Sequence, residues 1–355
     1  MAGPQPMSRL AQIISLLSLA LTAVHSESPA AAPANPHANA RARAVFAYIQ
    51  ALEARTDHRM LSGQFTNFGA GASLELPEEI AAQTGHWPAL IGVDYAGFNP
   101  VTHKGTLVTE EPNRVAAAYW KSGGLVTVSA HLYNPANPAG GGLRDTGVDL
   151  DALLEPGNPA HERWMQELDI LAAGLQELKA AGVVVLWRPF HEMNGAWFWW
   201  GGQPPAKLIR LWRHMFDYFT RTRGLDNLLW VYSPNHGPKT ADYYPGDGYV
   251  DIVGLDAYTD QVDPEHIRGY AEISGLPKPF GFTEYGPHGA ENPPGDYDYR
   301  RFIAGIVAHF PRTTFFMSWN AKWSPPRNHH AKELYDHPWM VNREDLPPGL
   351  AGGAP

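Results

Sequence analysis

The sequence predicts a closed (β/α)8 barrel, and three observations support this fold class. Eight short apolar segments rich in β-branched and aromatic residues recur along the 355-residue chain. Segments with helical spacing of their apolar residues separate most of them, which is the pattern of a parallel sheet. No second linker interrupts residues 41–345, so all eight units belong to a single domain. Eight such units favour a closed barrel over an open doubly wound sheet.

The eight predicted strands are short and end in polar or turn-forming residues. In chain order they are Met60–Phe65, Ala89–Tyr95, Gly124–His131, Val183–Pro189, Leu228–Ser233, Asp251–Tyr258, Phe280–Tyr285 and Thr313–Trp319. An open Rossmann-type sheet would need a GxGxxG turn after the first strand. The sequence SGQFTNFGAGAS at that point lacks this spacing, which makes the open sheet the weaker alternative.

Apolar residues at intervals of three and four predict the helices between these strands. One helix face is made by Trp164, Leu168, Leu171, Leu175 and Leu178. A second helix, Leu208 to Phe219, lies between Pro204-Pro205 and Gly224. Weaker patterns predict helices over Pro112–Lys121, Pro264–Ile273 and Tyr297–Phe310. The link Asn235–Tyr249 has little helical pattern, and Asn134–Asp149 is predicted as a long loop.

Both ends of the chain are expected to lie outside the barrel. Arg9 and the apolar run Leu10–Val24 predict a signal peptide over residues 1–26, so the protein is expected to be secreted. The run is too short for a convincing membrane span. A buried N-terminal helix is the alternative, but the Ala/Pro-rich segment 27–40 reads as a linker. Residues 346–355 are predicted to form a disordered tail.

Composition excludes several classes of function. A net charge of −9 and no basic patch argue against a nucleic-acid partner, and no membrane partner is expected. The chain has no cysteine, which excludes thiol catalysis, disulfides and a lipoprotein anchor. Neither a GxSxG elbow nor a Walker loop is present, and HEMNG departs from the HExxH metal motif at Gly195. We therefore expect a monomer without a cofactor or metal.

A histidine-rich stretch near the C-terminus, NHHAKELYDHPW (Asn328–Trp339), could in principle bind metal. Its spacing matches no firm metal-binding pattern, so a solvated closing helix is the preferred interpretation.

Polar and aromatic residues gather at the C-terminal ends of the predicted strands, where barrels of this type carry their sites. They are Asp94, Tyr95, His131, Arg188, His191, Glu192, Asp256, Tyr258, Glu284, Tyr285 and Trp319. A purely structural role would scatter such residues along the strands. Their accumulation at one end predicts a functional site.

Glu192 and Glu284 stand out in this set. They follow the fourth and seventh strands, which places them on opposite sides of one barrel mouth. Two carboxyls facing each other across an aromatic-lined cleft are the arrangement of glycoside hydrolysis. One protonates the leaving oxygen, and the other attacks the anomeric carbon or activates water. Structural salt bridges are the alternative interpretation of the two acids.

Three segments resemble glycoside hydrolase family 26. They are WRPFHEMNGAWFWWGG (Trp187–Gly202), FTEYGP (Phe282–Pro287) and SAHLYNP (Ser129–Pro135). The resemblance runs from about Gln64 to Trp323, and the best-known members of the family are β-1,4-mannanases with a (β/α)8 barrel.

The resemblance implies a role for each matching residue. Glu192 resembles the general acid/base and Glu284 the nucleophile of a retaining mechanism, with the carboxyls about 5–5.5 Å apart. Residues expected to contact the sugar or shape its site are His131, His191, Trp197, Asp256, Tyr258 and Trp319. The Tyr258 hydroxyl is expected to hydrogen-bond the nucleophile. Asn320 stands where some members carry a basic residue for a more distant sugar. Arg188 could help to hold the negative charge of the nucleophile, or it could brace the interior of the barrel.

The activity implied is a secreted endo-β-1,4-mannanase acting on mannan, glucomannan or galactomannan. Other substrates of the same mechanism, β-1,3-xylan or mixed-linkage β-glucan, stay open, as does an exo-acting mannobiohydrolase. A barrel that binds sugar without cleaving it is a further alternative.

Overall fold

The computed structural model describes residues 1, 3, 32–98, 105–139, 142–287 and 295–352. The predicted signal peptide therefore lies almost entirely outside the described residues, and it stays a prediction. Among the described residues, no helix is long and apolar enough to cross a membrane.

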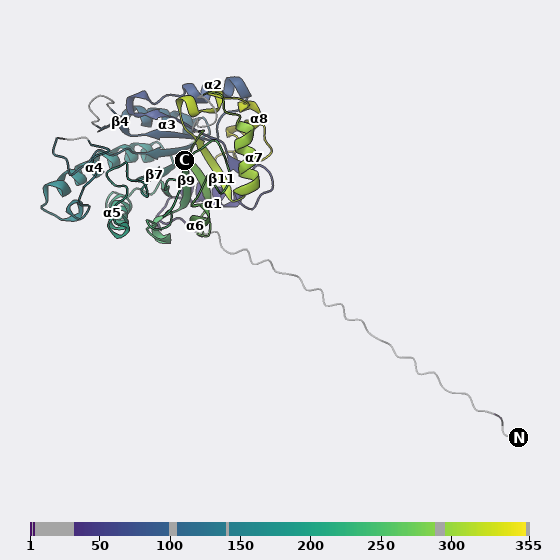
Figure 1. The fold of residues 1–355 in the computed structure, drawn as a ribbon, viewed down its shortest axis with the longest axis horizontal. Helices are drawn as coiled ribbons and strands as arrows, with labels where there is room; N and C mark the ends of the chain where they lie inside the picture. The colour runs from purple at the N-terminus through teal and green to yellow at the C-terminus, as the bar shows by residue number, and fades with distance from the viewer. Residues whose placement is uncertain (2, 4–31, 99–104, 140–141, 288–294, 353–355) are drawn as a thin grey trace. The chain divides into compact units, whose positions relative to one another are not determined.

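Eight parallel strands close into a barrel, which confirms the predicted fold class (Figure 1). The strands are β2 (Gly63–Phe68), β3 (Leu90–Asp94), β6 (Leu125–Ser129), β7 (Val185–Arg188), β8 (Leu228–Tyr232), β9 (Ile252–Tyr258), β10 (Phe280–Gly286) and β11 (Thr313–Ser318). Each pairs with the next along the chain, and β11 returns to β2 through the pair Ser318–Gln64. Because all strands are parallel, their C-terminal ends meet at one face.

The first predicted strand, Met60–Phe65, is divided in the structure. β1 (Met60–Leu61) pairs with β11 and with the short β12 (Met340–Val341), while β2 starts at Gly63 and pairs with β3. A Cβ at Gly63 would lie 2.2 Å from the carbonyl oxygen of Phe316, so only glycine allows this close approach. A hairpin of β4 (Ala96–Phe98) and β5 (Gly105–Leu107) follows β3 and was not predicted.

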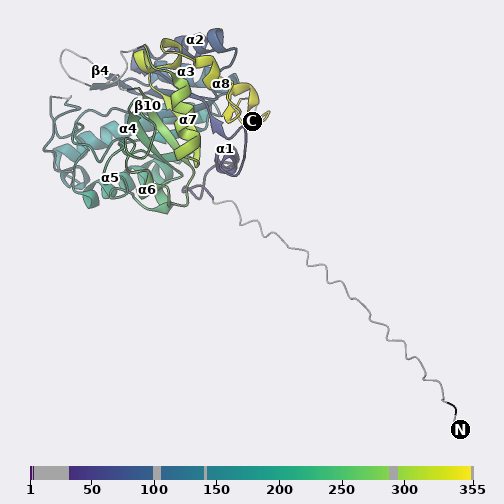
Figure 2. The same ribbon diagram turned by 45° about the vertical axis from the view of Figure 1, so that its right-hand side comes forward.

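Helices surround the strands (Figures 1 and 2). They are α1 (Ala40–Leu52), α2 (Glu75–Thr84), α3 (Glu110–Lys121), α4 (Pro159–Ala180), α5 (Pro205–Asp217), α6 (Tyr270–Ile273), α7 (Tyr299–His309) and α8 (Ala331–Tyr335). A π-helical turn, Tyr218–Thr222, continues α5. Single 3₁₀ turns cover Gly69–Gly71, Ala152–Leu154, Asp247–Tyr249, Ala321–Trp323, Pro325–Arg327 and Arg343–Asp345.

The strongest helical pattern of the sequence is confirmed in α4. Asn158 caps this helix by accepting a hydrogen bond from the amide of Ala160, and Trp164, Leu168 and Leu171 are buried. The prediction of a helix over Pro264–Ile273 is wrong for its first part, because only Tyr270–Ile273 is helical. Gly269 adopts φ +91°, a left-handed conformation that interrupts any helix extending from Pro264.

The predicted linker and tail are both shorter than expected. Asn35 and Ala38 are buried, and the amide of Ala34 donates a hydrogen bond to Asp251, so the chain packs before residue 40. The prediction of a disordered tail is also wrong for residues 346–352, the part of it that the structure describes, because Leu346 and Ala351 are buried. Both segments contain apolar residues among their prolines and glycines, and the barrel surface buries them.

One buried carboxyl has no partner in the described part of the chain. Glu167 lies on the inner face of α4 with 0% exposure, and neither of its carboxyl oxygens accepts a hydrogen bond. Burial raises the pKa of Glu167 well above its usual value. The unfolded chain binds this proton only below about pH 4.3, so the folded state loses stability as the pH rises above that value.

We predict that Glu167→Gln is more stable than the wild type at pH 8 and that the difference shrinks at pH 5. Between these two pH values the gain in the free energy of unfolding should change by about 1–3 kcal/mol, because the variant has no proton to retain. Urea unfolding at both pH values measures it. The matched control is Glu162→Gln, an exposed position on the same helix. A gain that is independent of pH would contradict the prediction.

Candidate active site

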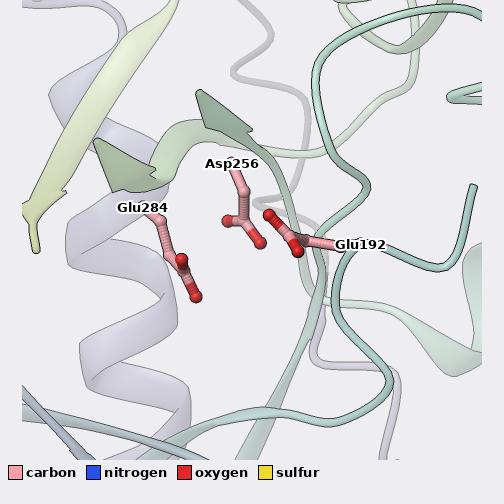
Figure 3. Close-up of side chains that lie close together, drawn as sticks. All are labelled: Glu192, Asp256 and Glu284. Carbon is pink, nitrogen blue, oxygen red and sulfur yellow. The ribbon is translucent and has the colours of Figure 1, made fainter. Parts of the chain in front are cut away.

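Three carboxyls meet at the C-terminal face of the barrel. Asp256 and Glu284 lie at the ends of β9 and β10, and Glu192 follows β7 (Figure 3). One oxygen from each of the three lies within 4.8 Å of the others. The structure therefore brings together the two glutamates that the sequence placed on opposite sides of the barrel mouth.

The backbone after β7 is strained at and just before Glu192. Phe190 and Glu192 have φ values of +51° and +55°, which bulky L-residues rarely adopt. Two hydrogen bonds hold this conformation: the amide of Glu192 donates to the Ser233 carbonyl at 2.7 Å, and Trp200 Nε1 donates to the His191 carbonyl at 2.8 Å. Such strain persists only where surrounding contacts enforce it, and it is concentrated at functional sites.

Arg188 is the buried cation of the site. Its Nη1 lies 3.0 Å from Asp256 Oδ2, and its Nη2 donates to Glu284 Oε1. Burial alone would lower the pKa of Arg188, but the charges of Asp256 and Glu284 raise it above its usual value. The guanidinium therefore stays charged between the two carboxylates.

Both oxygens of Glu284 have hydrogen-bond donors. Arg188 contacts Oε1, and the hydroxyl of Tyr258 donates to Oε2 at 2.7 Å. The side chain of Glu284 is only 4% exposed, so these donors replace water around the carboxylate. Hydrogen bonds and a cation of this kind stabilise the ionised form.

Asp256 anchors the other end of Arg188. Its Oδ1 accepts hydrogen bonds from Ser233 Oγ at 2.8 Å and Thr283 Oγ1 at 2.6 Å. Burial and then the charge of Glu284 raise the pKa of Asp256, while Arg188 acts in the opposite direction. Because Asp256 is 0% exposed, it acts on the site by holding Arg188 in place.

Glu192 has the opposite electrostatic character to Glu284. Among the described residues, the side-chain donor to Glu192 is Trp197 Nε1, which lies 2.6 Å from Oε2. Burial and then the negative charge of Glu284 raise the pKa of Glu192 to about 7, against the lowering effects of Trp197, Arg188 and His131. Near neutral pH, Glu192 can therefore hold and release a proton, whereas the two oxygens of Glu284 accept from Arg188 and Tyr258.

Two histidines form the adjoining wall. Nε2 of His131 lies 3.1 Å from Nε2 of His191, and both rings pack edge-to-face with Phe198. Burial, with the charges of His131 and Arg188, holds the pKa of His191 well below its usual value. His191 is therefore neutral.

The tryptophans around the site differ in how deeply they are buried. Trp197 is half-buried beside Glu192, and Trp319, at 7% exposure, stacks on Phe65 with ring centroids 3.9 Å apart. Trp199 and Trp200 are fully buried and donate to carbonyl oxygens of Leu132 and His191. These two tryptophans of the WFWW segment therefore pack inside the protein.

A pocket of about 510 Å³ adjoins the histidine wall. It is lined by Asn67, Phe68, Ala70, Gly71, Gly97, His131, Leu143, Arg144 and Phe198. Its volume falls in the range of small-molecule sites. Of these residues the sequence analysis named only His131 as a site residue. Two features of the sequence could have indicated this pocket. They are the polar and aromatic residues directly after the first strand and the long loop after the third strand.

Among the described residues, Glu192, Asp256 and Glu284 are the only group of three or more acids and histidines whose ligand atoms converge. Arg188 already contacts two of these carboxylates. In the histidine-rich stretch, His329 pairs with Asp296 and His330 with Glu333, so these histidines have separate partners. The helix predicted there is short, Ala331–Tyr335, and three of its residues are buried.

Residues 34–345 match the sequence pattern of Glycosyl hydrolase family 26. The chain belongs to this family. It is 39% identical over 347 residues to a mannan endo-1,4-β-mannosidase of Bacillus subtilis (strain 168), with 94% of each chain covered. A second mannan endo-1,4-β-mannosidase, from Thermothelomyces thermophilus, is 32% identical over 88% of this chain and 62% of the relative.

Solved structures of the family share the fold. The structure of Bacillus subtilis mannanase man26 has a TM-score of 0.82 and 36% identity, covering 91% of this chain and 98% of that one. The β-mannanase from a symbiotic protist of the termite Reticulitermes speratus, solved with a gluco-manno-oligosaccharide, has a TM-score of 0.71 and 25% identity, covering 89% and 97%. The chain is therefore a glycoside hydrolase.

We predict that Arg188→Met lowers the free energy of unfolding at pH 7 by about 3–5 kcal/mol, because it leaves two buried carboxylates without their cation. Chemical unfolding measures the loss. The matched control is Arg114→Met, which breaks an exposed ion pair with Glu111 and should have a much smaller effect. Equal effects of the two substitutions would contradict the buried ion pairs.

Proposed function

We propose that this protein is a retaining endo-β-1,4-mannanase that cleaves mannan, glucomannan or galactomannan. The observation that carries the mechanism is the short separation of the two glutamates, of which one oxygen each lies within 4.8 Å of the other. Retaining glycosidases hold their carboxyls about 5–5.5 Å apart, whereas inverting enzymes leave about 6.5–9.5 Å for a water molecule. The separation here supports direct attack by one carboxylate.

The different surroundings of the two acids assign the roles. Glu284, held by Arg188 and Tyr258, is the nucleophile that attacks the anomeric carbon. As the glycosidic bond breaks, Glu192 transfers its proton to the leaving oxygen, which keeps charge from developing there. The products of this first step are a shortened chain and a glycosyl ester on Glu284.

In the second step, Glu192 acts as a base instead of an acid. Glu192, now ionised, removes a proton from a water molecule whose oxygen attacks the anomeric carbon. The ester bond to Glu284 breaks, and its carboxylate returns to the hydrogen bonds of Arg188 and Tyr258. Two inversions at one carbon give a product with the β configuration of the substrate.

The remaining site residues are proposed to hold the sugar. Trp197 offers aromatic surface beside Glu192, Trp319 stacks on Phe65 with 7% of its surface exposed, and His131 and His191 offer the edges of their rings. Flat aromatic rings suit the apolar faces of pyranose sugars, and their burial keeps water away from Glu192. The names of the relatives, mannan endo-1,4-β-mannosidases, support β-mannan as the substrate.

We predict that Glu284→Ala and Glu192→Ala each remove nearly all release of reducing sugar from mannan. Azide distinguishes them, because it is a small nucleophile that needs no general base. With Glu192→Ala it should attack the glycosyl ester and give a β-glycosyl azide from an aryl mannoside with a good leaving group. With Glu284→Ala it should attack the opposite face and give the α product.

The matched control for these variants is Glu155→Ala, an exposed acid in the loop before α4, which should keep wild-type activity. Wild-type activity of either active-site variant, or the same azide anomer from both, would contradict the assigned roles. NMR of the azide products determines the anomer.

The pH dependence provides a second test. Glu192 must be protonated for the first step, so kcat/KM should fall as the pH rises through about 7. Trp197→Phe removes the hydrogen bond that lowers the pKa of Glu192, so this alkaline limb should move up by about 0.5–1 pH unit. Trp87→Phe, remote from the three carboxyls, is the control. A limb that stays in place or moves down would contradict the assignment of Glu192.

The choice of substrate is tested by a panel of polysaccharides with the product lengths recorded. We predict cleavage of mannan and glucomannan to mixed oligosaccharides, as expected of internal cleavage. Release of mannobiose alone from the start would indicate exo action. Cleavage of β-1,3-xylan or barley glucan with mannan left intact would replace the proposed substrate, and binding of mannan without cleavage of any polysaccharide would indicate a sugar-binding protein.

A further inference from the structure

A buried carboxylate on the opposite side of the histidine wall from Glu192 has no part in the mechanism above. Asp94 is the last residue of β3, its side chain is 0% exposed, and it contacts none of the three converging carboxyls. The sequence analysis noted it as a polar strand end and gave it no role. Asp94 contacts His131, which in turn contacts His191.

Four hydrogen-bond donors converge on Asp94. Its Oδ1 accepts from the amides of Ala96 at 2.8 Å and His131 at 3.1 Å. Its Oδ2 accepts from Ser129 Oγ at 2.5 Å and lies 2.8 Å from His131 Nδ1. Burial by itself would raise the pKa of Asp94, but His131 and the other donors bring it below the usual value. Asp94 is therefore an ionised acceptor, and Nδ1 of His131 must carry a proton.

The other nitrogen of His131 faces His191. The contact of 3.1 Å between the two Nε2 atoms requires one proton between them, because two bare or two protonated nitrogens repel each other. The Nδ1 atom of His191 is buried and has no hydrogen-bond partner among the described residues. Among the described residues, the one hydrogen bond on the His191 ring is therefore the one it shares with Nε2 of His131, and Asp94 fixes the far end of that pair.

Hydrogen bonds to the two histidine rings specify which ring nitrogens carry protons, and packing contacts alone do not. Aromatic neighbours such as Phe198 and Trp200 restrict where the His191 ring lies, but they do not choose which nitrogen carries a proton. A hydrogen bond to one ring nitrogen fixes the state of the other. Asp94 is the only carboxylate that contacts either ring in the described part of the chain.

We propose that Asp94 is a positioning residue of the reaction, which fixes the proton on Nδ1 of His131 and, through the contact between the two Nε2 atoms, the orientation and protonation of His191 beside Glu192. The row Asp94–His131–His191 then presents one defined set of ring edges to the sugar. The kinetic consequence rests on the proposed glycoside hydrolysis, whereas the protonation pattern does not.

The protonation pattern is tested first, by nitrogen-15 NMR of histidine-labelled protein with His131→Gln and His191→Gln used to assign the signals. In the wild type, His131 Nδ1 should stay protonated and His191 should stay neutral from pH 5 to 8. In Asp94→Asn, the amide offers a donor to Nδ1, so the His131 proton should move to Nε2. An unprotonated His131 Nδ1 in the wild type would overturn the proposal, whatever the enzyme cleaves and whether or not the variant folds.

The kinetic test uses the β-glycan that the wild type cleaves fastest, so it does not depend on mannan being the substrate. Asp94→Asn should lower kcat by about 100-fold with KM changed less than about threefold, a size typical for loss of an orienting group at an active site. The matched control is Asp251→Asn. Asp251 is also fully buried and accepts the amides of Ala34 and Trp230, but it lies before β9 at the other end of the barrel. It should keep the wild-type kcat and KM.

A double-mutant cycle separates positioning from a purely structural role. If Asp94 acts through His131, Asp94→Asn should change kcat by less than about threefold in a His131→Ala background. An equal loss of kcat in both backgrounds would show that Asp94 supports the barrel rather than the histidine pair, and would overturn the proposal. Loss of activity in the wild type on every β-glycan would instead contradict the proposed function, with the NMR result still deciding the protonation pattern.

Discussion

The site depends on the buried ion pairs of Arg188 with Asp256 and Glu284. One oxygen from each of three carboxyls lies within 4.8 Å of the others, and one guanidinium contacts two of these carboxyls. A buried charge without a partner is strongly unfavourable, so Arg188 favours the ionised forms of the two carboxyls that it contacts. Within the described part of the chain, Arg188 pairs with Asp256 and Glu284 and not with Glu192, and burial together with Glu284 raises the pKa of Glu192 to about 7. The division between a charged and a proton-carrying acid therefore follows from the position of one arginine.

The barrel provides that position because parallel neighbouring strands end at the same level. β7 carries Arg188, β9 carries Asp256 and Tyr258, and β10 carries Glu284. Glu192 lies beyond the regular strand, in a left-handed conformation that the carbonyl of Ser233 and the indole of Trp200 hold in place. The same principle operates at β3 and β6, whose paired ends Asp94 and Ser129 contact each other and connect to the histidine wall. The regular strands position Asp94, Asp256 and Glu284, and a short strained segment positions Glu192.

The sequence predicted the eight strands and the two facing glutamates because both depend on local patterns: apolar runs, and polar residues directly after them. It offered Arg188 as a group that could hold the charge of the nucleophile but could not decide between this and a bracing role, since the contacts with Asp256 and Glu284 depend on the register of strands far apart in the chain. The role of Asp94 was missed for the same reason. The helix expected from Pro264 failed at Gly269, where a left-handed turn outweighs the apolar spacing. The end of the linker was misjudged because Ala34 and Asn35 are held by hydrogen bonds to Asp251 and Leu225, which are distant in sequence.

The central claim is that Glu284 is the ionised carboxyl that attacks the sugar while Glu192 carries the proton. Incubation with 2-deoxy-2-fluoro-β-mannobiosyl fluoride tests it directly, because the fluorine slows both steps and the good leaving group allows the ester to accumulate. Mass spectrometry of the digested protein should find the sugar on the peptide that contains Glu284. A label on Glu192 or Asp256 would contradict the account.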